Sequence, residues 1–263
     1  MWNMIIIAPF VNTLLLITKL VGNFGIAIIL FTLLIRVVTH PLTVKQLKGT
    51  QAMQDLQSDP RYIKMQEKYK DDKEKLSQEQ MKLYQEMGIS PFSSCLPTLI
   101  QFPIIIGLYQ AVIRALSSTP MEMLNLTRFI YPVLKDLAGL VPLNNQFLWM
   151  DLSQPERVFI PGLNIGIPVL AVLVVITSYL QSKLMTPPPS AGNEQAAMMS
   201  NMMSLYMPFL MGYLAYTLAS GLALYFLASS VVGVAQYALM GKLHWENLKL
   251  FQKPSSVKTI SKK

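Results

Sequence analysis

Long blocks of apolar residues are the feature that most restricts how this chain can fold. Each approaches or exceeds the roughly 20 residues that a helix needs to cross hydrocarbon. The blocks are Phe24–Pro41, Phe92–Arg114, Pro161–Met185 and Met198–Leu243. Only 14% of the residues are charged, well below the roughly 25% that is usual for a soluble domain. The pattern predicts an all-α protein that crosses a membrane several times.

A turn signal at Ser220-Gly221 divides the last block into two helices. We therefore expect five transmembrane helices, at residues 23–43, 92–114, 161–185, 198–219 and 220–241. The earlier segment 1–22 is apolar but contains Pro9, Asn12 and Lys19. We interpret it as an interfacial helix on the outer surface, with a sixth span as the alternative. It lacks the charged start and small-residue cleavage site of a secretory signal.

The distribution of Lys and Arg predicts the orientation of the chain. Sixteen of these residues lie on one side of the expected spans, in residues 44–90, at Lys183 and in the tail 241–263. Only three lie in the loop 115–160. Connections rich in Lys and Arg stay in the cytosol. The C-terminus is therefore expected to be cytoplasmic.

Residues 44–91 form the largest expected cytosolic element. Their charges of both signs are mixed with apolar side chains. Ser58-Asp59-Pro60 predicts a helix that begins near residue 60, and the capping box Ser77–Gln80 predicts one that begins near residue 78. A cytosolic helical hairpin is the favoured interpretation. The alternative is a solvated spacer, since mixed charge is also typical of exposed helices.

Three further segments connect or follow the expected spans. The outer loop 115–160 contains four prolines and Trp149, which predicts short helices that rest at the membrane interface. The cytosolic linker 186–197 has the composition of a flexible connection. The tail 242–263 carries six lysines and one acid. This basic cytosolic tail is expected to bind polyanions, and a purely topogenic role is the alternative.

Arg36 lies inside the apolar run Phe24–Thr39. An arginine at mid-bilayer costs about 2.5–3.5 kcal/mol on insertion scales. The expected spans contain no Asp or Glu, so its partner is water in a cavity or a carboxylate of another molecule. The alternative is a side chain that snorkels to the inner headgroups, because Arg36 lies roughly 18 Å into a core of about 30 Å.

A set of polar residues within the expected spans maps to the cytosolic half of the membrane. Thr32 and Arg36 are one turn apart and share a helix face. If the polar faces converge, they line a hydrophilic groove that is open to the cytosol and closed to the outside. Each Thr or Gln has a simpler alternative, a hydrogen bond to a neighbouring helix. The other candidates are Thr98, Gln101, Thr177, Gln181, Asn201, Ser204 and Gln236.

Motifs of common enzymes are absent from the sequence. It has no HExxH, no GxSxG, no phosphate-binding loop and no pair of Asp residues within a span, the patterns that carry hydrolytic and nucleotide chemistry. Cys95 is the only cysteine, and His40 and His244 lie far apart in the sequence. We expect neither an enzyme nor a cofactor or metal site.

Six short motifs follow one another along the chain. They are Asn23–Gly25, Thr32–Thr43, Ser77–Tyr84, Pro91–Pro103, Met207-Pro208 and Gly221–Tyr225. In this order they resemble the YidC/Oxa/Alb family of membrane insertases over nearly the whole chain. Ala219, Phe226 and Ser230 depart from the residues common in the family. Without the large extracytoplasmic domain and extra first helix of Gram-negative members, the chain is similar to a compact bacterial form in the plasma membrane, and an organellar relative is the alternative.

The resemblance implies a membrane protein insertase and chaperone that works without nucleotide hydrolysis. Arg36 would attract the polar or acidic leading segment of an inserting protein, and Tyr225 and Ser229 join the expected groove. The implied partners are nascent or newly made membrane proteins and the lipid bilayer, with the Sec translocon, ribosome or signal recognition machinery at the hairpin and tail. A channel or solute carrier and a structural assembly subunit are the alternatives.

Overall fold

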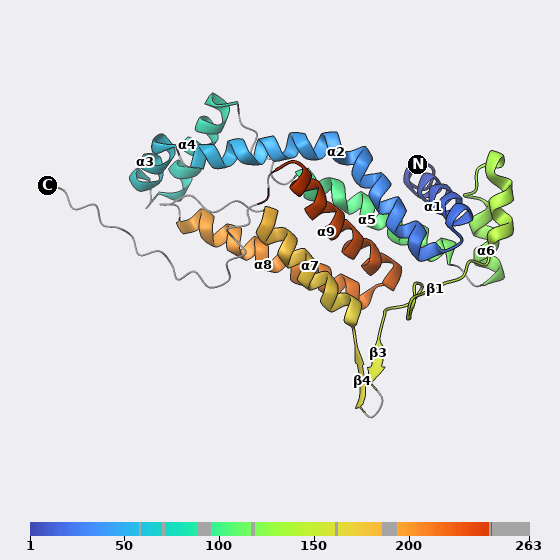
Figure 1. Ribbon diagram of the computed structural model, residues 1–263. Helices are drawn as coiled ribbons and strands as arrows, with labels where there is room; N and C mark the ends of the chain where they lie inside the picture. The colour runs from blue at the N-terminus through green and yellow to red at the C-terminus, as the bar shows by residue number, and fades with distance from the viewer. Residues whose placement is uncertain are drawn as a thin grey trace.

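The computed structural model describes residues 1–57, 59–69, 72–88, 96–116, 119–160, 163–185, 194–241 and 243. In chain order the elements are η1 (Asn3–Ile7), α1 (Ala8–Val21), α2 (Phe24–Gln57), α3 (Pro60–Lys68), α4 (Lys73–Glu86), α5 (Leu96–Ala115), α6 (Pro120–Thr127), η3 (Pro132–Leu140), β1 (Gln146–Phe147), β2 (Met150–Asp151), β3 (Val158–Ile160), β4 (Leu163–Ile167), α7 (Val169–Met185), α8 (Glu194–Thr217) and α9 (Ser220–Leu239). The helices form an elongated bundle (Figure 1). We call the end at which α3 and α4 lie the α3–α4 end. The opposite end, with α6, η3 and β1–β2, is the loop end.

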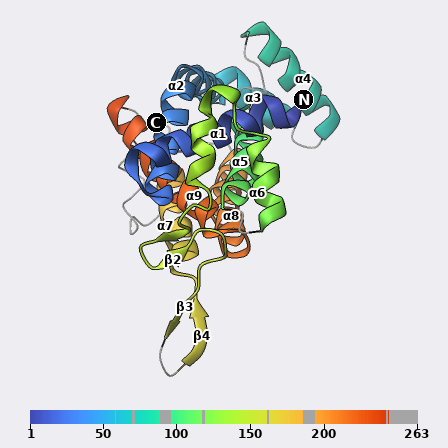
Figure 2. The ribbon, with the colours of Figure 1, turned by 90° about the vertical axis from the view of Figure 1, so that its right-hand side faces the viewer.

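Helix α9 lies in the middle of the bundle. It packs against α2, α5, α7 and α8, and the view along the bundle in Figure 2 shows the other helices around it. Its first half is almost entirely buried, from Ser220 to Phe226. A helix that is apolar on all sides is stable only when other helices or lipid surround it, which explains its central place.

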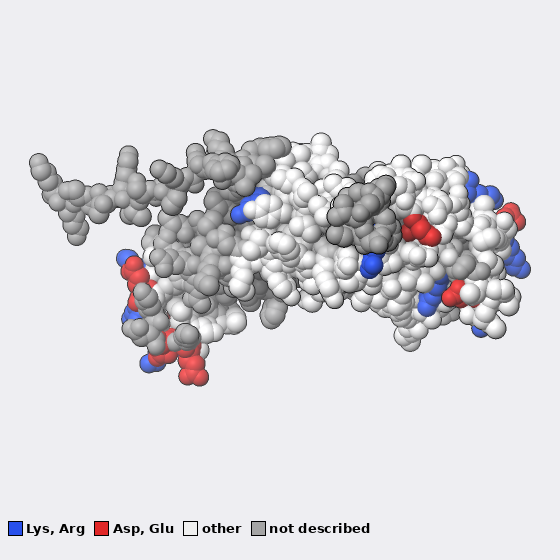
Figure 3. Space-filling view, turned by 90° about the horizontal axis from the view of Figure 1, so that it is seen from below, with Lys and Arg blue, Asp and Glu red and all other residues white. Residues whose placement is uncertain are grey.

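Several of these helices have the length and composition of membrane spans. The stretches Asn3–Val21, Phe24–Met53 and Ser220–Leu239 are long and apolar enough to cross a bilayer, and Val169–Met185 is a shorter apolar helix. Figure 3 shows most of the charged side chains on this face toward the two ends and a largely uncharged surface between them, with a few isolated charges. The described residues therefore form a mostly helical membrane protein, and the number of five spans stays a prediction.

Helix α2 continues well beyond the expected span. It runs without a break from Phe24 to Gln57 and contains Pro41. Proline removes one hydrogen bond of the helical ladder and typically bends a helix, and α2 bends part-way along its length (Figure 1). The polar second part of α2 thus connects the apolar bundle directly to α3 and α4.

Two aspartates begin the helices at the α3–α4 end. The Asp59 carboxylate accepts a hydrogen bond from the Arg61 N–H at 2.8 Å, and Pro60 is the first residue of α3, as expected. Helix α4 begins at Lys73 and not near residue 78. Asp72 accepts a hydrogen bond from the Lys75 N–H at 3.1 Å, so Asp72 supplies the N-cap about one turn before the expected capping box. Asp is as good an N-cap as Ser, and the earlier start adds helical turns.

The loop end is closed by hydrogen bonds to the start of α9. The Ser220 N–H donates to the Gln154 carbonyl at 2.8 Å, and the Gly221 N–H donates to the Leu152 carbonyl at 3.0 Å. The Ser220 hydroxyl donates to the Asp151 carbonyl at 2.5 Å. The first N–H groups of a helix have no partner within the helix, so the loop 151–154 satisfies them.

The third expected span is shorter than the sequence predicts. Helix α7 begins at Val169, whereas the preceding strands β3 (Val158–Ile160) and β4 (Leu163–Ile167) form an antiparallel pair, which projects away from the bundle (Figures 1 and 2). A short apolar run that contains β-branched residues and a Pro-Gly pair fits a hairpin as well as a helix. The short helices expected in residues 115–160 are present as α6 and η3, their place at a membrane interface stays a prediction, and β1–β2 follows them in the sequence.

Candidate functional site

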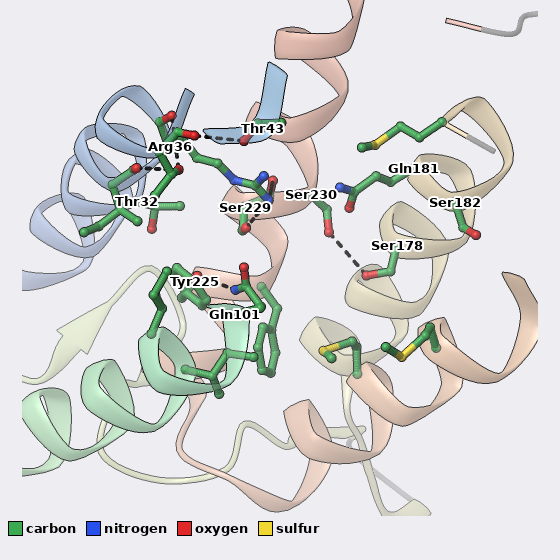
Figure 4. A pocket seen from close by; sticks show the side chains of 18 of the residues that line it. Thr32, Arg36, Thr43, Gln101, Ser178, Gln181, Ser182, Tyr225, Ser229 and Ser230 are labelled. Carbon is green, nitrogen blue, oxygen red and sulfur yellow. Dashed lines mark hydrogen bonds between the residues drawn. The ribbon is translucent and has the colours of Figure 1, made fainter. Parts of the chain in front are cut away.

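A cavity of about 390 Å³ lies among α2, α5, α7, α8 and α9. Helices α5 and α7 line it with the halves that lie nearer the α3–α4 end, and α2 lines it with its middle part, from Thr32 to Leu47. Figure 4 shows polar side chains from several of these helices directed into it. Its polar lining comprises Thr32, Arg36, Thr39, Thr43, Gln46, Gln101, Ser178, Gln181, Ser182, Tyr225, Ser229, Ser230 and Tyr237.

Arg36 spans the cavity wall from α2 to α9. Its Nη2 donates to the Ser229 carbonyl at 2.9 Å and to the Ser229 hydroxyl oxygen at 2.6 Å. These bonds hold the guanidinium against α9 (Figure 4). Of the described side chains that line the cavity, Arg36 alone is charged. Its positive charge is therefore not neutralised by the cavity wall.

Two further hydrogen bonds join the helices around Arg36. Gln101 of α5 donates from Nε2 to the Tyr225 hydroxyl of α9 at 2.7 Å, and this tyrosine is only 2% exposed. Ser178 of α7 and Ser230 of α9 lie 3.3 Å apart through their hydroxyl oxygens. Polar contacts of this kind fix one helix relative to another inside a membrane. The wall of the cavity is thus tied to α9 on two sides.

Most of the side chains expected in the groove meet at this cavity. Thr32, Arg36, Gln101, Gln181, Tyr225 and Ser229 all line it. Thr177 does not, because it faces away and its hydroxyl donates to the Leu173 carbonyl of its own helix at 2.8 Å. Gln236 also lies outside the lining and contacts His40. The side chains of Thr98 and Asn201 are outside the described residues, and Ser204 is buried in α8 without lining the cavity.

Several lining residues were missed at the level of the sequence. Thr39 and Thr43 follow Arg36 by about one and two turns of α2, so helical spacing alone identifies them. Ser178 and Ser182 flank the predicted Gln181 on α7, and Ser230 and Tyr237 lie on α9. Serine gives a weak signal in a membrane helix because it also bonds its own backbone.

A packed layer separates the cavity from the loop end. Its side chains come from α2, α5, α9 and the loop, and each is at most 1% exposed: Phe31, Leu108, Val112, Leu152 and Leu222. No group of three His, Cys, Asp or Glu in the described part of the chain is placed to hold a metal ion. The arrangement is a dead-end polar cavity that offers a cation and hydroxyl groups to a ligand.

A model of the family described as 60Kd inner membrane protein matches residues 16–247. The chain belongs to this family. The membrane protein insertase YidC of Fusobacterium nucleatum is 37% identical over 225 residues, which cover 85% of this chain and 89% of the relative. The insertase MisCA of Bacillus subtilis is 32% identical over 244 residues, covering 91% and 78%. A crystal structure described as active YidC insertase, with the first transmembrane domain resolved, is 28% identical with a TM-score of 0.49; the match covers 83% of this chain and 42% of that one.

Membership of the 60Kd inner membrane protein family confirms the resemblance found in the sequence motifs. The family consists of membrane insertases and not of catalytic enzymes. It also makes the chain a bacterial membrane protein, in agreement with its apolar helices.

Proposed function

We propose that this protein inserts hydrophobic segments of client proteins into the bilayer from the cytosol. The polar cavity receives the hydrophilic flank of the client, and Arg36 attracts acidic residues in that flank. The apolar segment then moves sideways into lipid, where each buried CH₂ contributes roughly 0.8 kcal/mol. This transfer requires no nucleotide.

The observation that carries the proposal is the uncompensated charge of Arg36 in the cavity. A cation in a membrane protein normally pairs with an acid or reaches water. The described lining contains no acid, and Ser229 provides only neutral acceptors. A ligand that brings its own carboxylate would supply the missing negative charge.

The charges at the α3–α4 end support the proposed orientation. Helices α3 and α4 carry six of the 22 lysines and arginines, whereas residues 115–160 carry three, and this difference favours a cytosolic position for α3 and α4. The cavity would then be accessible from the cytosol, and the packed layer would close it toward the outside. This closed layer argues against the alternative of a channel, because a channel needs a continuous polar path.

The partners belong to the same proposal. Newly made membrane proteins are the clients and the bilayer is their destination. The α3–α4 hairpin and the tail 242–263 are candidate contacts for the Sec translocon, the ribosome or signal recognition machinery. Of the tail, only Leu243 is among the described residues.

The proposal is tested with the purified protein in liposomes and two versions of a short single-span client. One version has an aspartate in its translocated tail and the other has asparagine at that position. Arg36→Ala should lower insertion of the aspartate client about tenfold or more, the size of one lost charged hydrogen bond. Arg36→Lys should retain part of the activity because it keeps the positive charge.

Lys19→Ala is the matched control, because it removes an exposed positive charge from α1, outside the cavity. It should insert both clients like the wild type. Failure of the wild type to insert either client would reject the insertase function. Equal insertion of the aspartate client by wild type and Arg36→Ala would reject the role of Arg36.

A further inference from the structure

The two hydrogen bonds of Arg36 engage the same nitrogen. Nη2 donates to both the carbonyl and the hydroxyl of Ser229. An arginine has five N–H donors in total, two of them on Nη2. Both Nη2 hydrogens are therefore used, and within the described part of the chain the Nε and Nη1 hydrogens have no protein acceptor.

The planar geometry of the guanidinium group makes Nη2 the nitrogen that matters most for binding a carboxylate. A carboxylate binds an arginine most tightly through two parallel hydrogen bonds to one edge of the planar group. Only two edges present a pair of parallel N–H groups: Nε with Nη2, and Nη2 with Nη1. Nη2 belongs to both. As long as Ser229 holds Nη2, Arg36 can offer a carboxylate only single hydrogen bonds from Nε or Nη1.

The surroundings of Nη2 show that this contact is built into α9. Gly233 follows Ser229 by one turn, and a Cβ placed on Gly233 would lie 3.5 Å from Nη2 and 2.7 Å from Nε2 of Gln181. A side chain at residue 233 would displace the Gln181 amide. Nη2 therefore lies against α9 beside Ser229 and the bare backbone of Gly233, with Gln181 next to it.

The Ser229 side chain is itself held in place. It is 6% exposed, and Tyr225, one turn earlier on α9, lies against it. Tyr225 is fixed in turn by the bond from Gln101. The acceptor for Nη2 is thus part of a connected set of side chains from α2, α5 and α9.

We propose that Ser229, by accepting both Nη2 hydrogens, blocks the two edges of Arg36 that could each give a carboxylate two parallel hydrogen bonds. The cavity then binds client carboxylates by single hydrogen bonds and releases them quickly. This inference rests on the proposed insertase function and names the residue that limits how tightly clients are held. A site that a client only passes through benefits from weak binding, because two parallel hydrogen bonds to a carboxylate in a poorly solvated cavity would slow the release of the client. Ser229 is a positioning residue that acts through Arg36.

The test compares release of the aspartate and asparagine clients from the full-length protein in liposomes. Complexes are formed, diluted, and photo-crosslinked at successive times to give a release half-time for each client. Ser229→Ala frees one Nη2 hydrogen and completes one two-donor edge. It should lengthen the half-time of the aspartate client roughly tenfold, the worth of one charged hydrogen bond, and leave that of the asparagine client unchanged.

Three companion variants separate this effect from a structural defect. Ser229→Thr keeps the hydroxyl and should release both clients like the wild type. Ser229→Cys keeps the volume but weakens the acceptor, so it should slow the aspartate client in the same direction as Ser229→Ala. Thr217→Ala removes an exposed hydroxyl that bonds only its own helix backbone, and it should change neither half-time.

Two results would overturn the inference. One is an unchanged ratio of the two half-times in both Ser229→Ala and Ser229→Cys. The other is equal slowing or loss of both clients, which would make Ser229 a packing residue only. Either result, obtained with a wild type that still inserts both clients, leaves the insertase function standing.

Discussion

Single contacts decide how closely the segments of this protein approach one another, and Gly25 is an instructive case. It lies in the first turn of α2, where β1 comes close to the helix. A Cβ built on Gly25 would overlap the ring of Phe147 and would lie 2.8 Å from its Cβ. Rotation of the ring relieves only the first overlap, because the Cβ of Phe147 moves only with the backbone. The Asn23–Gly25 motif thus has a packing reason.

Gly25→Ala should therefore destabilise the protein, measured as thermal unfolding in detergent. Overpacking costs about 1–3 kcal/mol, and the better helix propensity of alanine returns at most about 1 kcal/mol. A net loss of about 1–2 kcal/mol is expected. Gly139→Ala is the control, since open space surrounds the position of its Cβ. An unfolding temperature for Gly25→Ala at or above that of the control would contradict the packing argument.

On α7, the sequence did not predict which of two adjacent residues faces the cavity. The sequence identified Arg36 and Gln181, because a charge or an amide in an apolar helix is costly. It favoured Thr177, whereas the structure places Ser178 in the cavity. Adjacent residues differ by about 100° around a helix axis. Because α7 is apolar on nearly every side, no periodicity indicated which of the two faces the cavity.

At the scale of elements, α3 and α4 are attached to the body through a small hydrophobic cluster. Leu56 at the end of α2, Tyr62 of α3 and Leu83 of α4 are each at most 9% exposed, and Met65 and Tyr84 pack against them. The cluster is separate from the main core of the bundle. The position of the hairpin therefore depends on few contacts, and it can loosen without unfolding the spans.

Leu56→Ala should release α3 and α4 while the bundle stays folded. Loss of a buried leucine typically costs about 2–5 kcal/mol, which exceeds the stability expected of so small a cluster. Hydrogen exchange followed by mass spectrometry should show faster exchange in residues 60–86 and unchanged exchange in α9. Met81→Ala, at a side chain that is 46% exposed, should exchange like the wild type. Equal acceleration in α9 would mean that the hairpin and the bundle unfold together.

The elements differ in how well the sequence predicts them. Length and apolarity identify the helices, and α9 begins at Ser220, the predicted boundary, although the break itself lies at residues 218–219 and not at Ser220-Gly221. Residues 163–167 were assigned to the third span although they form β4, because their mostly apolar residues have no periodicity that separates strand from helix. The start of α4 was misplaced because Asp72 and Ser77 are both good caps. The structure uses Asp72, whose carboxylate accepts a hydrogen bond from the Lys75 N–H, and the longer helix that results gains additional backbone hydrogen bonds.

At the scale of the whole molecule, the cavity lies in one half and the packed layer fills the other. This asymmetry predicts one-sided access. In a Cys95→Ser background, Gln101→Cys and Gln181→Cys should react with a membrane-impermeant thiol reagent from the cytosolic side only. Water must reach the cavity for Arg36 to stay charged at low cost.

Leu222→Cys is the control for this labelling experiment. The leucine is fully buried in the packed layer, so a cysteine there should react from neither side. Labelling of Gln101→Cys from the outside would show that the proposed orientation is inverted. Labelling from both sides would indicate a pore and would favour the channel alternative.

The packed layer also determines where the membrane potential acts. If water fills the cavity from the cytosolic side, as proposed, ions reach Arg36, and most of the voltage falls across the apolar layer beyond Arg36 and not across the full bilayer. A bacterial membrane is negative inside, and each acidic residue carried outward gains about 2.3 kcal/mol per 100 mV. An acidic tail that leaves Arg36 would receive nearly all of this gain in one short step. The electrical driving force is then greatest at the point where the hydrocarbon barrier is highest.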